Sequence, residues 1–181
     1  METKNIVKKT IDLIQSGKFN EALEKLDKVE EKNSDIFFLM GSIYLNLKKI
    51  DLAEKNLKLA SKLNDKNHSI FHNLAVLYTN KGDHESAKNN YLKAIKINNN
   101  VASMYELANL YIKKKNYDEA QKYYEYILKN DPNHKRANIG LGNLYMIKND
   151  FKKGHSYINK ATGLIRFTEN GMRIIWLKEK K

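Results

Sequence analysis

Residues 101–134, VASMYELANLYIKKKNYDEAQKYYEYILKNDPNH, decide how the rest of the chain is interpreted. The first half carries apolar residues at the i, i+3, i+4 and i+7 spacing of a one-sided helix: Met104, Leu107, Ala108 and Tyr111. After a polar break at 113–116, a second stripe follows: Tyr117, Ala120, Tyr124 and Ile127. Pro132 ends this stripe, because proline lacks an N–H and disfavours helical geometry in the residue before it. The stretch therefore predicts two antiparallel amphipathic helices joined by a short turn.

The same pattern returns at nearly constant intervals. A small residue marks each expected second helix, at successive spacings of 31, 34, 33 and 34 residues: Ala22, Ala53, Ala87, Ala120 and Gly154. A tyrosine keeps step in four of the expected first helices: Tyr44, Tyr78, Tyr111 and Tyr145. We therefore expect five helix–turn–helix units at about 3–33, 34–67, 68–100, 101–134 and 135–162, followed by a capping segment at 163–181.

This pattern resembles the tetratricopeptide repeat (TPR), a helix–turn–helix of about 34 residues. Residues 101–134 match its skeleton as Met104-x2-Leu107-Ala108-x2-Tyr111, then Ala120-x3-Tyr124 and Pro132. The resemblance implies an all-α fold: a right-handed superhelical solenoid of about five TPR-like units spanning 1–162, with a short C-terminal cap. The first unit is the most degenerate, as expected for a terminal repeat with one neighbour.

The tail, GLIRFTENGMRIIWLKEKK at 163–181, departs from the period. It contains Asn-Gly at 170–171, the dipeptide favoured in two-residue type I′ hairpin turns. Pairing about that turn would set Phe167 opposite Ile174 and Ile165 opposite Trp176. We favour a β-hairpin or extended cap, and a capping helix is the alternative. In either form, Trp176 is expected to cover the end of the fifth unit.

Bulk composition limits the function classes. Cysteine is absent, which removes disulfides, thiolate catalysis and cysteine metal sites. The net charge of +12 raises nucleic acid or an acidic partner as possibilities, but nearly all of the basic residues are lysine, the weaker phosphate ligand. Nucleic acid is therefore the less favoured partner. The sequence has no apolar run that approaches a membrane span and no apolar secretory segment near Met1, so we expect a cytoplasmic protein that does not bind membranes.

The resemblance also implies where a ligand lies. In this family the first helices line the concave surface of the superhelix, and ligand peptides cross it. The repeat register places polar candidates for a partner-binding groove at His72, Asn73, Asn80, Tyr105, Asn109, Lys113, Arg136 and Asn143. Asparagine suits such a groove because its amide both donates to and accepts from an extended backbone. The alternative is that these asparagines are solvated residues of an asparagine-rich protein.

Toward the N-terminus the same register selects apolar candidates for a groove or a self-association surface: Ile11, Phe38, Leu39 and Leu45. They could hold a partner's amphipathic helix or a second copy of the chain. Alternatively, they pack against the chain's own neighbouring helix. One subset of the family binds C-terminal carboxylates of chaperones, but Phe38 and Glu106 occupy the lysine and arginine positions of that clamp here. We therefore exclude chaperone-tail binding.

No residue set suggests chemistry. His68 and His72 are spaced i, i+4, but no further ligand lies at helical spacing beside them, so we expect no metal site. Gly140 and Gly142 lack the third glycine of a dinucleotide loop, and no cofactor is expected. We predict a non-enzymatic protein-interaction module that binds a peptide or helical segment of an unspecified partner. The alternatives are a self-associating, homo-oligomeric scaffold and, less favoured, a lysine-rich nucleic-acid-binding protein or an accessory subunit of an enzyme.

Overall fold

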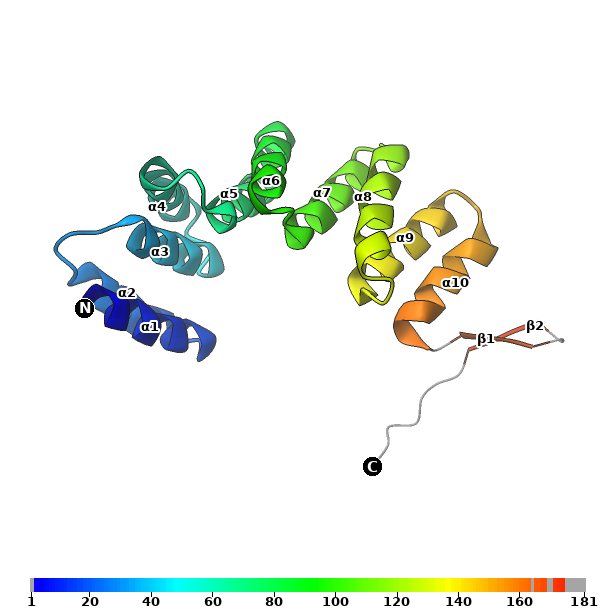
Figure 1. Ribbon diagram of the computed structural model, residues 1–181, viewed down its shortest axis with the longest axis horizontal. Coiled ribbons are helices and arrows are strands. Elements are labelled where there is room, and N and C mark those ends of the chain that lie inside the picture. The colour runs from blue at the N-terminus through cyan, green and yellow to red at the C-terminus, as the bar shows by residue number, and fades with distance from the viewer. Residues whose placement is uncertain (1, 164, 169–170, 175–181) are drawn as a thin grey trace, which may run out of the picture. The chain divides into compact units, whose positions relative to one another are not determined.

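The computed structural model describes residues 2–163, 165–168 and 171–174. Over these residues the chain forms ten α-helices followed by two short strands (Figure 1). The elements are α1 (Glu2–Gln15), α2 (Phe19–Asp27), α3 (Ser34–Asn46), α4 (Ile50–Leu63), α5 (His68–Lys81), α6 (His84–Asn98), α7 (Val101–Lys113), α8 (Tyr117–Asn130), α9 (Lys135–Ile147), α10 (Phe151–Thr162), β1 (Ile165–Thr168) and β2 (Gly171–Ile174).

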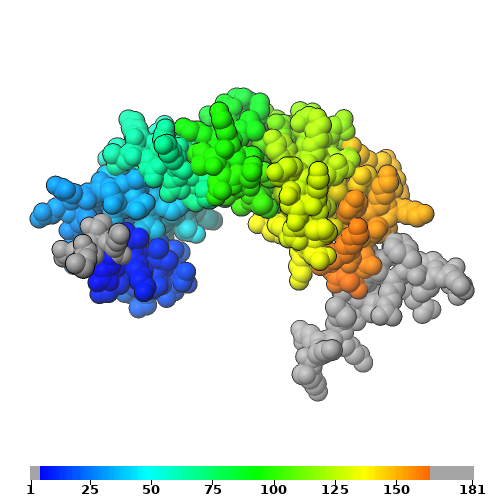
Figure 2. All heavy atoms as spheres, in the orientation of Figure 1, coloured from blue at the N-terminus to red at the C-terminus, as the bar shows by residue number. Residues whose placement is uncertain are grey.

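The helices pack as consecutive antiparallel pairs within two compact units, Met1–Asn100 and Val101–Lys181. The first unit contains the pairs α1–α2, α3–α4 and α5–α6, and the second contains α7–α8 and α9–α10. Within each unit, the second helix of one pair also contacts the first helix of the next, so that neighbouring pairs are continuous in the space-filling view (Figure 2). The expected all-α fold of repeated helix pairs is confirmed. The division into five units at the stated boundaries stays a prediction.

Each turn between the two helices of a pair contains one residue in the left-handed conformation. These residues are separated by 31, 34, 33 and 34 positions, the spacing of the small residues in the second helices: Gly17, Lys48, Gly82, Lys115 and Asn149. Glycine adopts this conformation without steric cost, whereas a side chain there costs about 1 kcal/mol or more. The turn geometry is therefore the same in every pair, although only two of the five residues are glycine.

Small residues allow the two helices of a pair to approach closely. A Cβ added to Gly41 in α3 would lie 2.7 Å from Cγ of Leu57 in α4. A Cβ added to Gly142 in α9 would lie 2.7 Å from Cγ1 of Ile158 in α10. Both distances are shorter than side chains tolerate, so glycine at these positions fixes the depth at which the larger residue packs.

A polar cluster joins α4 to α5 in the first unit. Glu54 of α4 accepts hydrogen bonds at Oε1 from the Tyr78 hydroxyl at 3.1 Å, and at Oε2 from the Lys81 ammonium at 2.6 Å. Lys58, one turn further along α4, lies 2.6 Å from Oε1. The hydrogen bond from Lys58, followed by that from Lys81, lowers the pKa of Glu54 from 4.5 to about 2.

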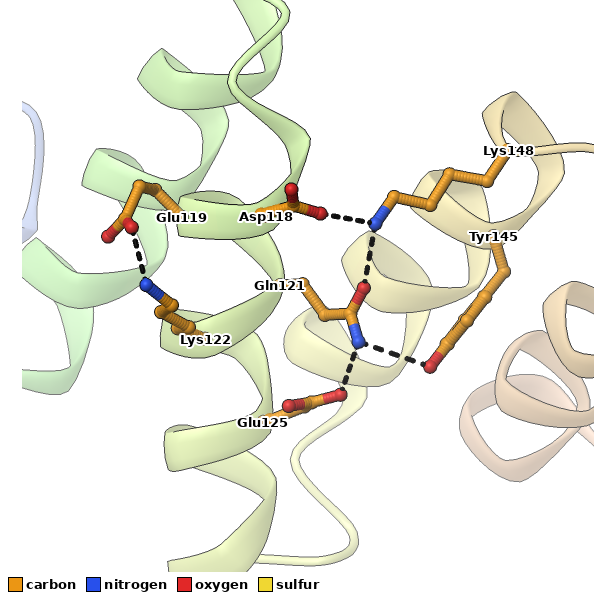
Figure 3. Close-up of polar contacts among 7 residues, drawn as sticks. All are labelled: Asp118, Glu119, Gln121, Lys122, Glu125, Tyr145 and Lys148. Carbon is orange, nitrogen blue, oxygen red and sulfur yellow. Dashed lines mark hydrogen bonds and ion pairs between the residues drawn. The ribbon is translucent and has the colours of Figure 1, made fainter.

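The equivalent cluster joins α8 to α9 in the second unit (Figure 3). Gln121 stands 67 residues, two repeats, after Glu54, and its amide nitrogen donates to Oε1 of Glu125 at 2.7 Å and to the Tyr145 hydroxyl at 3.4 Å. The Lys148 ammonium donates both to Oε1 of Gln121 and to Oδ1 of Asp118, each at 2.9 Å. The junction therefore keeps its architecture while its charges are rearranged.

The two strands at the C-terminal end pair antiparallel, with Ile165 opposite Ile174 and Phe167 opposite Met172. The expected pairing of Phe167 with Ile174 is therefore wrong. The two registers differ by two residues along one strand. Since such a shift leaves every residue on the same face, alternation of apolar residues cannot distinguish them.

The other expectations for the tail concern the turn at 169–170 and the contact made by Trp176, and these residues lie outside the described part of the chain. Among the described residues, no helix combines the length and the apolar character needed to cross a membrane.

Candidate functional site

The apolar candidates lie in the first unit and are mostly part of its core. Leu39 is only 7% exposed and packs in a cluster with Leu26 and Ile36, so it does not belong to a surface patch. Phe38 and Leu45 are half-buried and pack against the cluster formed by α4, α5 and α6. Of the two alternatives, packing within the chain therefore holds for Leu39, Phe38 and Leu45, and of the four candidates only Ile11, at 40% exposure, is an exposed apolar side chain.

The polar candidates of the first unit lie on α5. The amide nitrogen of Asn73 donates to Oγ of Ser42 at 2.8 Å, and that hydroxyl donates to the Phe38 carbonyl at 2.8 Å. Asn73 therefore ties α5 to α3. The ring of His72 lies 5.8 Å from that of Tyr91 on α6, whereas Asn80, near the end of α5, is exposed.

Three candidates of the second unit, Tyr105, Asn109 and Arg136, belong to a connected polar network across α7, α8 and α9. The Tyr124 hydroxyl donates to Oδ1 of Asn109 at 2.6 Å, and the Asn109 amide nitrogen donates to Oε2 of Glu106 at 3.3 Å. Glu106 also accepts a hydrogen bond and ion pair from Arg136 at 3.0 Å. The Arg136 guanidinium lies over the ring of Tyr105, 4.3 Å from its centroid, and that ring packs against Tyr124 at 5.8 Å.

Gly140 of α9 makes room for this network. A Cβ at Gly140 would lie 2.6 Å from Cζ of Tyr124, so any other residue would displace the tyrosine ring. Tyr124 is 1% exposed, and burial, with smaller contributions from Tyr105 and Glu106, raises its pKa above the ordinary value of 10.0. The phenol therefore remains a protonated donor to Asn109 under physiological conditions.

The network uses only part of the hydrogen-bonding capacity of the Asn109 amide. An asparagine amide offers two N–H groups and two acceptor lone pairs, and one of each is used here. One donor and one acceptor of Asn109 therefore remain for a ligand, in an orientation held by Tyr124 and Glu106. This arrangement differs from the freely solvated asparagine that the sequence left open.

The exposed face of α9 continues this surface. Its residues recur at spacings of three, four and four positions, which places them on one side of the helix: Arg136, Ile139, Asn143 and Ile147. Ile139 is 38% exposed and Ile147 is 46% exposed. Lys113, at the end of α7, is also exposed. Two isoleucines therefore flank Asn143 on a solvent-facing stripe, next to the Arg136 guanidinium. We call this stripe the α9 face.

Sequence reasoning missed part of this arrangement. It placed Tyr124 in the apolar stripe, and the residue is indeed buried, but its hydrogen bond to Asn109 was not foreseen and Ile139 and Ile147 were not selected. The repeat register contained a signal for the position of Tyr124. Gly140 stands one repeat after Glu106, and a glycine in place of a glutamate leaves space for a neighbouring ring.

The site offers recognition groups and lacks a reactive set. Among the described residues, no three histidine, aspartate or glutamate side chains come together in a way that could hold a metal ion. The network combines a guanidinium, a carboxylate, an amide and two aromatic rings, all held by one another. Such an arrangement can present hydrogen bonds and apolar contacts to a peptide in a fixed geometry.

Comparison with known protein families gives a consistent result. Models of the tetratricopeptide repeat match residues 34–67, 68–101 and 101–134, which together make up more than half of the chain. No curated protein matches the chain.

Several solved structures are similar in fold. The crystal structure of MamA superposes with a TM-score of 0.74 at 21% identity, covering 85% of this chain and 92% of that chain. The structure of PilF from Pseudomonas aeruginosa gives 0.81 at 14% identity, covering 88% and 75%. YrrB, described as a TPR protein with an unusual peptide-binding site, gives 0.68 at 17% identity, covering 87% and 84%. These likenesses extend the repeat fold over most of the chain.

Proposed function

Because this chain belongs to the tetratricopeptide repeat family, we propose that it is a non-enzymatic module that captures a peptide or helical segment of another protein on the exposed side of its first helices. The repeat fold supports a role as a protein-interaction scaffold. In the second unit, we assign the capturing surface to the polar network of Tyr105, Glu106, Asn109 and Arg136 together with the α9 face.

The observation that carries this proposal is the mutual support within the network. Side chains that are already held by neighbours lose little conformational freedom when a ligand binds, and this saves about 0.5–1.5 kcal/mol for each immobilised side chain. Arg136 is fixed by both Glu106 and the Tyr105 ring, although its side chain is 63% exposed. A group that is both ordered and exposed is suited to recognition.

A ligand would use both characters of the surface. Asn143 and the remaining amide groups of Asn109 can hydrogen-bond to a peptide backbone, and Ile139 and Ile147 can contact apolar side chains. Buried apolar area contributes about 25 cal/mol per Å², so two isoleucines covered by a ligand supply much of the affinity of a short peptide. The amides then set its orientation and register.

The test is peptide selection with matched variants. A random peptide library is selected on the immobilised full chain, and binding of the selected peptides is measured by fluorescence anisotropy. We expect the double variant Ile139→Ser/Asn143→Ala to weaken binding by about tenfold or more. The control, Leu52→Ser/Asn89→Ala, alters an exposed aliphatic residue and an exposed asparagine on second helices and should leave binding unchanged.

Circular dichroism establishes that both double variants retain their helical content. Equal peptide binding by the two double variants would refute the assignment to the α9 face. Light scattering after size exclusion addresses self-association: a dimer that dissociates in Ile139→Ser/Asn143→Ala would identify a second copy of the chain as the partner.

A further inference from the structure

Positive charge is concentrated on the last helix pair of the second unit. Residues 101–134, which contain α7 and α8, have five basic and five acidic residues. Residues 135–162, which contain α9 and α10, have six basic residues and one acidic residue, Asp150. The Asp150 carboxylate already accepts from the backbone N–H of Lys153 at 3.1 Å and pairs with its ammonium at 3.2 Å. The α9–α10 pair is therefore a local basic surface.

The same pair exposes apolar residues that the preceding pairs cover. Phe151, the first residue of α10, is 53% exposed, whereas its equivalents are half-buried: Phe19, Ile50, His84 and Tyr117. Ile158, two turns along the same side of α10, is half-buried, whereas its equivalents are buried: Leu26, Leu57, Tyr91 and Tyr124. Within each unit, second helices such as α4 and α8 pack against the first helix of the next pair. The exposed side of α10 is thus the side on which a further first helix would lie.

The polar residues on this side reverse the charge found at the equivalent junction. Between α8 and α9, the second helix supplies the acceptors Asp118 and Gln121, and Lys148 of the next first helix donates to both. On α10, Lys152 stands at the position of Asp118 and His155 at that of Gln121, each 34 residues on. A helix that docks on α10 must therefore bring a carboxylate to Lys152, which is exposed. We call this surface, formed by Phe151, Lys152, His155 and Ile158, the α10 face.

The chain's own segments are poor matches for the α10 face. The first helix of the described chain, α1, carries Leu13 and Ser16 at the positions of Tyr145 and Lys148, so a second copy docked through α1 would bring Lys152 no carboxylate there. Residues 175–181, IWLKEKK, contain three lysines and one glutamate and have the same sign of charge as α10. β1 follows α10 and contacts it, but Phe151 lies at the opposite end of that helix.

We propose that the α10 face docks an acidic amphipathic helix of a partner protein, in the place that a further first helix would take. Apolar side chains of the partner would cover Phe151 and Ile158, and its aspartate or glutamate side chains would pair with Lys152. The charge reversal selects such a helix over a basic or neutral one, because like charges brought together at an interface disfavour the wrong partner. The α10 face is separate from the α9 face, so a partner could bind to either one alone.

The probe is a fluorescein-labelled synthetic peptide of about four helical turns. It has leucines at the i, i+3, i+4 and i+7 spacing and glutamates beside them, and its binding to the full chain is followed by fluorescence anisotropy. We expect a dissociation constant on the order of 10–100 μM. Raising the salt concentration from about 0.05 M to about 0.5 M should weaken binding roughly three- to tenfold. The same peptide with lysine at every glutamate position should bind at least about tenfold less tightly.

Matched variants locate the peptide on the chain. Phe151→Ser/Lys152→Glu should weaken binding of the acidic peptide by about tenfold or more. Tyr126→Ser/Lys114→Glu is the control, because it alters an exposed aromatic residue and an exposed lysine of the same unit with the same change in charge, and it should leave binding unchanged. Equal binding by these two double variants would overturn the proposal, and so would equal binding of the acidic and basic peptides.

Two further measurements protect this comparison. Circular dichroism checks that each variant keeps its helical content; if Phe151→Ser/Lys152→Glu does not, Lys152→Glu alone should weaken binding about three- to fivefold, and an unchanged affinity would overturn the proposal. Ile139→Ser/Asn143→Ala should bind the acidic peptide normally. Failure of the α10 face is therefore distinguishable from failure of the α9 face.

Other occupants of the α10 face give different outcomes. Phosphatidylserine vesicles that bind the wild-type chain but not Phe151→Ser/Lys152→Glu, when the acidic peptide binds neither, would overturn the proposal in favour of a lipid surface. A dimer seen by light scattering that dissociates in Phe151→Ser/Lys152→Glu would overturn it in favour of a second copy. Peptide binding at least about tenfold tighter in Trp176→Ala would show that the chain's own tail competes, whereas equal binding supports the partner helix.

Discussion

Replacement of Glu54 by glutamine should destabilise the chain at neutral pH and have little effect in acid. Glu54 is the centre of the α4–α5 junction, where Lys58, Lys81 and Tyr78 all direct hydrogens at its carboxylate. Its side chain is 17% exposed. Glutamine keeps the size and one acceptor oxygen, and it stands at the equivalent position of the second unit as Gln121. The substitution therefore removes the charge with little change in packing.

The magnitude follows from the pKa of Glu54. Lowering it from 4.5 in the unfolded chain to about 2 in the folded chain corresponds to at most about 3 kcal/mol of stability. The lysine partners are more exposed than Glu54 and water screens them, so we expect about 1–2 kcal/mol at neutral pH. Since the pKa is lower in the folded state, this stability is complete above pH 4.5 and is lost as the pH falls toward 2.

Urea unfolding followed by circular dichroism measures this contribution. We compare the free energy of unfolding of the wild-type chain and Glu54→Gln at about pH 6 and about pH 2.5, where the difference should nearly vanish. Glu85→Gln is the matched control, because Glu85 forms only an exposed pair with Lys88 and should contribute less than about 0.5 kcal/mol. A Glu54→Gln difference that is equal at the two pH values would refute the electrostatic explanation.

Four further substitutions test the turns, the close packing and the second junction. Lys115→Gly should raise the melting temperature and stabilise the chain by about 0.5–1 kcal/mol, because a lysine with φ of 59° is strained in this turn. Gly82→Ala, at φ of 77°, should lower the melting temperature by a similar amount. Equal responses of the two variants would contradict the turn geometry. Gly140→Ala should cost about 1–3 kcal/mol in urea unfolding, because the new Cβ meets the Tyr124 ring, and an unchanged midpoint would show that the ring can move aside. Lys148→Met should cost about 0.5–1 kcal/mol by the same measurement through loss of the two hydrogen bonds that join α8 to α9, and no loss would mean that solvent replaces them.

The repeat fold was predictable because its signal is periodic. Apolar spacing gave the helices, and small residues at intervals of about 34 gave the pairing of helices. The left-handed residues in the turns were harder to predict, since Lys48, Lys115 and Asn149 are not typical of that conformation. Their position became evident only from the shared spacing. The strand register was missed for a different reason, because a period of two fits two registers equally well.

The candidate site was less predictable, because the register identifies positions and does not show which side chains bond to one another. It selected Asn109 and Arg136, but the link between them runs through Glu106 and Tyr124, which come from different helices. Leu39 shows what the register left open. Its position allowed either a surface or packing within the chain, and the packing of α1 and α2 against α3 buries it.

A repeat protein contains its own control for such errors, because each position occurs several times in one chain. The Glu54 and Gln121 junctions differ, but the difference is compensated: Glu54 is paired with Lys58, whereas Gln121 is paired with Glu125 at the same offset. The carboxylate is on the first residue in one junction and on the second residue in the other, so a donor still faces an acceptor in both. The contact is preserved, as maintenance of the fold requires. Asn138 has no such compensation, because an apolar position has become polar and its buried Oδ1 has no hydrogen-bond donor among the described residues. A buried acceptor without a donor costs stability, so the asparagine holds its pair of helices less firmly than the apolar residue of the preceding repeats would.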